Sequence, residues 1–166
     1  MEVPGYNSPM ISAPWLAPQA VARAAQVLDS FERLLGRPLI PRQDSPEADA
    51  RSLFEAPFPV LAHGTQADPL LDYGNRAALA LWEMDWPRFT ATPSRLTAEP
   101  DSRAAREKIL HAAAERGYVA HYSGVRVSAT GRRFRVEELI LWRVADGGGL
   151  AAGLAAAFPR WEFLQS

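Results

Sequence analysis

The strongest constraint on the fold is a pair of alternating segments on either side of Thr130 and Gly131. In residues 132–144 apolar side chains recur at every second position, a spacing typical of a β-strand with one buried face. These side chains belong to Phe134, Val136, Ile140, Trp142 and Val144. The preceding segment, 118–128, carries valines with the same alternation. The two segments therefore predict an antiparallel hairpin with a two-residue turn at Thr130 and Gly131.

A two-residue turn also fixes which residues lie opposite each other. It pairs Val127 with Phe134 and Val125 with Val136, so that all four apolar side chains share one face. A shift by one residue would place Arg126 opposite Phe134 instead. We therefore expect the register that the two-residue turn imposes.

Glu138 interrupts the apolar face of the predicted hairpin. In the expected register Ser123 lies opposite Glu138, and His121 is the next residue on the same face. A buried carboxylate without partners is strongly unfavourable, so Glu138 must be paired, protonated or next to a wet cavity. Three interpretations follow: a structural hydrogen bond, a polar anchor in a ligand pocket, or a catalytic acid or base.

The segments before the hairpin differ in their patterns. Residues 1–17 are rich in proline and predict an irregular N-terminal arm. Residues 18–36 predict an amphipathic helix, and residues 37–57, with prolines and charges but no periodicity, predict a connector. The apolar positions of this helix are Val21, Ala24, Leu28, Phe31 and Leu35. We expect the helix to dock on the outer face of the sheet or to pair with a second copy of the chain.

Residues 58–164 predict the compact domain. Two short apolar segments come first, and a segment that Asn75 can cap as a helix follows them. A second helix ends near Gly117, and three antiparallel strands complete the chain. The expected fold is α+β, with five antiparallel strands and the N-terminal helix as an extra element.

Composition excludes several classes of function. The chain has 166 residues and a formal net charge of -1, so it lacks the basic surface of a nucleic-acid-binding protein. It contains no cysteine, which excludes disulfides, thiolate metal sites and flavin–cysteinyl photochemistry. No apolar run is long enough for a membrane span, and we expect a cytoplasmic protein.

Four segments carry a resemblance to a known family: "HGTQADPLLDYGNRAALALWEMDW", "PSRLTAEPDSRAAREKIL", "GYVAHYSGVRVSATGRRFRVEELILW" and "GLAAAFPRW". Together they resemble the MEKHLA domain, which is similar to PAS domains, over residues 60–161. The resemblance implies a PAS-like five-stranded antiparallel sheet with helices on one face. It also implies a regulatory sensor of the kind that occurs as a stand-alone bacterial protein.

The resemblance singles out several polar residues. Those that match the family's motif are Tyr73, Asn75, Arg76, Ser94, Arg95, Glu99, Arg103, Tyr122, Gly124, Arg126, Gly131, Arg133 and Phe134. Ser94, Arg95 and Arg103 lie where PAS domains wrap short helices over the mouth of the pocket. An arginine there can hold a ligand carboxylate or phosphate, or can fix the loop by pairing with Glu99.

These observations favour a PAS-like sensory module that binds a small organic ligand and signals to a partner protein or a second copy in a homodimer. The expected ligand contacts are Glu138, Ser123, His121, Arg95, Ser94, Arg103, Phe134, Val136, Ile140, Trp142, Val125 and Tyr73. Two alternatives stay open. One is a small isomerase-like or hydrolase-like enzyme that uses Glu138 and His121, and the other is a ligand-free interaction or dimerisation module. His111 is a candidate haem ligand by position, but a lone helical histidine is usually a surface or core residue.

Overall fold

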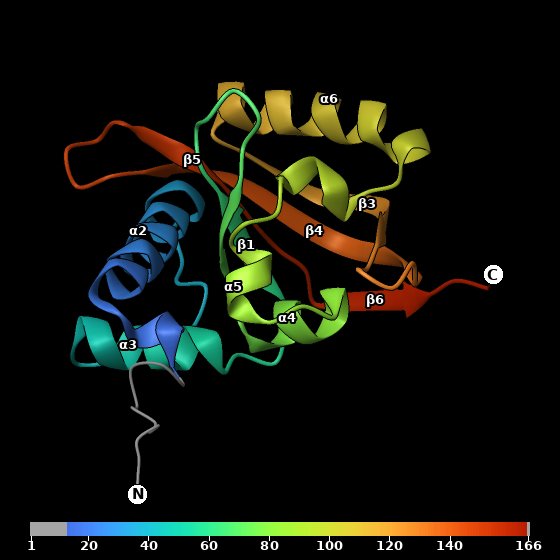
Figure 1. Cartoon of the computed structure of the whole chain (residues 1–166). Coiled ribbons are helices and arrows are strands. Elements are labelled where there is room, and N and C mark those ends of the chain that lie inside the picture. The colour runs from blue at the N-terminus through green and yellow to red at the C-terminus, as the bar shows by residue number, and fades with distance from the viewer. Residues whose placement is uncertain (1–12, 166) are drawn as a thin grey trace, which may run out of the picture.

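The computed structural model describes residues 13–165, in which helices cover both faces of one antiparallel sheet (Figure 1). The helices are η1 (Pro14–Leu16), α2 (Pro18–Leu35), α3 (Pro46–Phe54), α4 (Arg76–Trp82), α5 (Trp86–Phe89), η2 (Ser94–Thr97) and α6 (Pro100–Arg116). The strands are β1 (Val60–His63), β2 (Leu71–Gly74), β3 (Tyr118–Val127), β4 (Arg133–Ala145), β5 (Ala151–Ala157) and β6 (Arg160–Phe163). Most of the expected irregular arm of residues 1–17 lies outside the described residues.

The sheet confirms the α+β fold expected from the sequence. Its strand order is β2-β1-β5-β4-β3, and β6 adds a short strand that pairs with β4. β5 pairs with the second half of β4, and β6 pairs with its first half, along the same edge. No helix among residues 13–165 combines the length and the apolar composition that crossing a membrane requires.

The predicted register of the β3–β4 hairpin is wrong by one residue near the turn. The structure places Arg126 opposite Phe134 and Gly124 opposite Val136. The turn contains three residues, because the backbone N–H of Ser128 donates to the Arg132 carbonyl across residues 129–131. Gly131 takes the left-handed conformation, with φ of 87°. A three-residue loop that ends in a left-handed glycine is a common hairpin connection, and it moves the pairs between the turn and Val136 by one position.

The expected single apolar face of β4 is also wrong, because a β-bulge divides the strand. Glu137 and Glu138 lie together opposite Ser123, and Glu138 has a left-handed φ of 57°. The extra residue reverses the alternation of side chains beyond it. Phe134 and Val136 therefore lie in one hydrophobic core together with Leu139 and Leu141. The side chains of Ile140, Trp142 and Val144 lie in the other core, on the opposite face of the sheet.

Helix α2 docks on the outer face of the sheet, as its apolar stripe predicted. The rings of Phe31 and Trp142 meet edge to face with 4.9 Å between their centroids, and both side chains are fully buried. Trp142 Nε1 donates to the Val27 carbonyl at 3.2 Å, and the Ser30 hydroxyl accepts from the Ala145 N–H at 2.9 Å. The helix therefore belongs to the same folded unit as the sheet.

The inner face is covered by α4 and α6 (Figure 1). Asn75 caps α4, as predicted, by accepting the Ala78 N–H at 3.1 Å. Its amide group also accepts the Val60 N–H and donates to the Phe58 carbonyl, so it fixes the start of β1. From α4, the Trp82 ring packs against Phe134 with centroids 5.1 Å apart.

Phe31→Ala is expected to destabilise the protein by about 3 to 5 kcal/mol, because it leaves a cavity between α2 and Trp142. Urea unfolding followed by circular dichroism measures the change. Arg33→Gln, an exposed change on the same helix, serves as the control and should shift the free energy of unfolding by less than about 0.5 kcal/mol. Equal effects of the two variants would show that α2 does not hold the sheet in solution.

Candidate functional site

A small internal cavity lies between the inner face of the sheet and helix α6. Its volume is about 40 Å³, room for a water molecule or a small polar group. Its walls are formed by Leu61, Trp82, Thr97, Arg106, Ile109, Leu110, Arg126, Leu139, Leu141, Ala156 and Phe158. The walls are apolar except at a few points, and two of those points are arginines. No carboxylate is among these residues.

The first arginine, Arg126, comes from β3 and is only 7% exposed. Its Nη1 donates to the Val125 carbonyl at 2.8 Å, and burial lowers the pKa of the guanidinium. The glycine at position 124 leaves room for the Arg126 side chain. A Cβ at Gly124 would lie 3.0 Å from Arg126 Nη1 and 2.9 Å from the Tyr122 ring. The Tyr122 hydroxyl lies next to the guanidinium and favours its charged form.

The second arginine, Arg106, points inward from α6 and is 6% exposed. Within the described part of the chain its side chain donates no hydrogen bond, and the Glu107 carboxylate 3.7 Å away is itself largely exposed. Burial, followed by repulsion from Arg126, lowers the pKa of Arg106 to about 10. At neutral pH the guanidinium therefore still carries its charge. The cavity holds two buried positive charges that repel each other.

Three side-chain nitrogen or oxygen atoms among residues 13–165 are buried without a hydrogen-bond partner. They are Trp82 Nε1, His63 Nε2 and the Tyr73 hydroxyl. Trp82 is among the residues that line the cavity, and its indole N–H is buried without a partner. Tyr73 belongs to the core on the other side of the sheet, where burial raises the pKa of its hydroxyl.

The polar group predicted around Glu138 does not lie inside the protein. Glu138 accepts a short hydrogen bond from His121 Nδ1 at 2.7 Å, but their side chains are 44% and 83% exposed. This hydrogen bond lowers the pKa of Glu138. Ser123 is exposed as well. The bulge explains the error, because it makes room for Glu138 at the surface where regular alternation would have pointed it inward.

The predicted apolar wall is divided between the two faces. Phe134 and Val136 lie in the inner core, below the cavity. Ile140 and Trp142 pack under α2 on the outer face, so their assignment to an inner wall is wrong. Val125 alternates with the inward Arg126 and is half-buried on the outer face. The phase change in β4 and the longer turn account for these corrections.

The residues predicted near the mouth of the pocket hold the loop before α6. Ser94 is buried, and its N–H donates to the Pro69 carbonyl at 2.8 Å. Arg103 Nε donates to the Ala98 carbonyl at 3.0 Å, and exposed Arg95 pairs with Asp68 at 3.1 Å. The contacts of all three residues are those of residues that fix a loop.

Two other side chains do not lie where the sequence predicted them. The Glu99 carboxylate pairs with Arg133 at 2.8 Å, and not with a neighbouring arginine of its own loop. His111, the candidate haem ligand, is 75% exposed on the outside of α6 and lies 3.4 Å from Glu115. It therefore does not face the internal cavity.

Arg106 was not among the site residues predicted from the sequence. The signal was present, because Arg106, Ile109, Leu110 and Ala113 recur at the three- and four-residue spacing of a buried helix face. An arginine in that stripe indicates a charged group that faces inward. Arg126 was singled out only through the family resemblance, without a position in the site.

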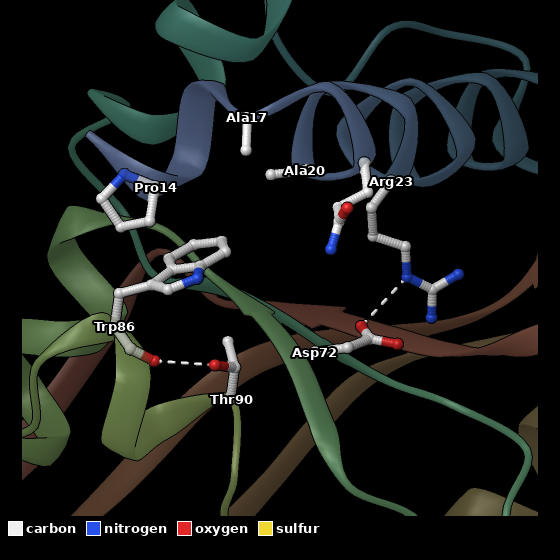
Figure 2. A pocket seen from close by; sticks show the side chains of 8 residues that line it. Pro14, Ala17, Ala20, Arg23, Asp72, Trp86 and Thr90 are labelled. Carbon is white, nitrogen blue, oxygen red and sulfur yellow. Dashed lines mark hydrogen bonds and ion pairs between the residues drawn. The ribbon is translucent and has the colours of Figure 1, made fainter. Parts of the chain in front are cut away.

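A larger cleft of about 440 Å³ opens on the other side of the sheet, between α2 and α5 (Figure 2). Arg23 Nε pairs there with Asp72 at 3.0 Å, and Arg23 Nη2 donates to the His63 carbonyl at 3.0 Å. The Thr90 hydroxyl donates to the Trp86 carbonyl. The charges of this cleft neutralise each other, whereas the internal cavity is lined by two buried arginines and no carboxylate. The internal cavity is therefore the stronger candidate site.

Comparison with known proteins agrees with this architecture. The sequence profile of the MEKHLA domain matches residues 21–163. The chain belongs to the MEKHLA domain family. In this MEKHLA chain the match includes most of α2, and so extends further than the resemblance over residues 60–161. None of the curated proteins matches the chain.

Solved structures show that the MEKHLA fold is PAS-like. A PAS domain from Colwellia psychrerythraea superposes with a TM-score of 0.62 at 11% identity, covering 70% of this chain and 96% of that one. A light-oxygen-voltage domain studied with a flavin analogue gives 0.55 at 14%, covering 72% and 86%. The PAS domain of a LuxR-family transcriptional regulator from Burkholderia thailandensis, solved with ethanol, gives 0.51 at 16%, covering 70% and 96%.

Arg106→Met is expected to raise the free energy of unfolding of the MEKHLA chain by about 1 to 3 kcal/mol, because it replaces a buried, unpaired charge by an apolar chain of similar length. Urea unfolding in a buffer without organic anions measures it. Arg116→Met, exposed on the same helix, is the control and should change stability little. A loss of stability in Arg106→Met would mean that the guanidinium has a structural partner.

The stability of the MEKHLA chain is expected to fall as the pH drops from about 7 to 5, in part through His63. Burial lowers the pKa of His63, and the Arg106 and Arg23 charges near it act in the same direction, whereas Asp72 and the Gly64 carbonyl oppose them. The unfolded chain therefore binds the proton first. His63→Asn, which can still donate to the Gly64 carbonyl, should flatten the pH dependence of the unfolding free energy, whereas exposed His111→Asn should not.

Proposed function

We propose that this chain is a regulatory module that binds a small organic ligand in the cavity between the inner sheet face and α6. In this proposal, ligand binding changes the domain, and a partner protein or a second copy of the chain responds to that change. One observation carries the proposal: two buried guanidinium groups face the cavity, and no carboxylate among its lining residues pairs with them. Natural proteins rarely leave such groups unmatched, and sites of ligand binding are a common reason for the exceptions.

The packing of α6 supports a response to the ligand. Although α6 has 17 residues, only Arg106 and Ala113 are fully buried, and Ile109 and Leu110 are half-buried. A helix that buries so little apolar surface is held weakly against the sheet. A ligand that adds contacts between α6 and the sheet therefore has a large effect on the position and stability of the helix.

His63 offers a connection from the inner face to helix α2. Its side chain is buried on the inner side of β1, and the charge of Arg106 acts on it. Its backbone carbonyl accepts the Arg23 guanidinium of α2. Gly153 of β5 lies against the same carbonyl, where a Cβ would approach it to 1.9 Å. We propose that ligand-dependent movement of α6 reaches α2 through this contact.

Ala156→Val is expected to abolish small-ligand binding while the fold survives, because the added methyl groups occupy a cavity of only about 40 Å³. The assay is the shift in melting temperature with a panel of small organic acids, amides and alcohols. Ala151→Val, at an exposed position of the same strand, should respond as the wild type does. Failure of the whole panel to stabilise the wild-type chain, or an equal response of Ala156→Val, would contradict the proposal.

A further inference from the structure

The residues that line the internal cavity indicate the chemistry of its ligand, whereas the volume of the cavity limits only the ligand's size. Two arginines more than nine-tenths buried line it, together with Trp82, whose indole N–H has no partner. Every one of these groups is a hydrogen-bond donor, and the guanidinium groups cannot accept. We infer that the ligand is a small organic carboxylate, whose oxygens lie between Arg106 and Arg126. This inference rests on the proposed function and names the chemical class of its ligand.

The charges on the walls point to an anion. Burying one unpaired guanidinium is costly, and a second one close by adds repulsion, which lowers the pKa of Arg106 further. A neutral ligand would leave that repulsion in place. An anion between the two side chains replaces this repulsion by two charge-assisted hydrogen bonds. Within the described part of the chain, no protein carboxylate occupies that position inside the cavity.

The shape and the lining of the cavity favour a carboxylate over other anions. A guanidinium presents parallel N–H groups that match the two oxygens of a planar carboxylate. The volume of about 40 Å³ suffices for a head group of that size. The remaining wall is apolar, with Leu61, Leu139 and Phe158, so it suits a short hydrocarbon body. A bulky, highly charged anion would leave its other oxygens against these side chains.

A route from solvent leads to the same arginine. An open depression of about 320 Å³ lies between α6 and the loop after β1. Arg106 and Leu110 line both this depression and the internal cavity. His63, whose Nε2 has no partner, lines the depression as well. We therefore place the access route along α6, where the Arg106 guanidinium can meet an anion before it is buried.

The test uses the full chain with sodium propionate and propionamide, which have nearly the same shape and differ in charge. Melting temperature and isothermal titration are measured against sodium chloride at equal ionic strength, with sodium sulfate as a second anion. We expect propionate to bind and stabilise, and propionamide and chloride to have no effect. The Trp82 indole N–H resonance, assigned with Trp82→Phe, should shift with propionate.

Arg126→Met and Arg106→Met should each weaken propionate binding by about tenfold or more, the loss expected for one charge-assisted contact. Because either change can alter stability, the comparison is the propionate-dependent shift within each variant. Arg116→Met on α6 and Arg88→Met on α5 remove exposed charges and should leave binding as in the wild type.

Three outcomes overturn the inference in distinguishable ways. Equal binding of propionate and propionamide would show a neutral ligand site, and the proposed function would survive without the carboxylate. Equal binding of sulfate and propionate, both lost in the arginine variants, would show a general anion site. If propionate has no effect and the wider panel also fails, the carboxylate and the ligand-binding function are both wrong.

Discussion

The whole architecture depends on strand β4, because it is shared by two hydrophobic cores. Its first half contributes Phe134 and Val136 to the inner core, and its second half contributes Trp142 and Val144 to the core under α2. The bulge at Glu137 and Glu138 makes this division possible, since regular alternation would point all four side chains to one side. It also lets one continuous strand connect the candidate ligand site with the docked helix.

The two cores differ in the way they are stabilised. Under α2 the large side chains are fully buried, and polar atoms such as Trp142 Nε1 and the Ser30 hydroxyl have partners. On the inner face, by contrast, two guanidinium groups are buried with no carboxylate among the residues that line the cavity, and the indole N–H of Trp82 is buried without a partner. Such positions lower the free energy of unfolding, and proteins tend to retain them where function requires it. The contrast sets the cavity apart from a packing defect, which would be apolar.

Much of the fold could be predicted from periodicity, whereas the site could not. The stripe of Leu28 and Phe31 predicted both the helix and its docking, because an apolar face of that size must be covered. The bulge could not be predicted in the same way: the even positions of β4 are apolar on both sides of it, and only tertiary packing decides that Leu139 turns inward. The register was predicted wrongly for a related reason. Thr130 and Gly131 are compatible with loops of two and of three residues, and the loop length sets the register. The one extra residue of the bulge decides whether Glu138 lies at the surface or in the predicted pocket.

The weak packing of α6 has a consequence for timing. The cavity holds only about 40 Å³. If the domain binds a ligand as proposed, one larger than a short acid would enter only while α6 is displaced. The observed association rate would then level off at high ligand concentration, at the rate at which the helix opens. Release must wait for the same opening. Such a domain would respond slowly to a brief pulse of ligand and would hold its signal after the free ligand has gone, so it would record an average over time.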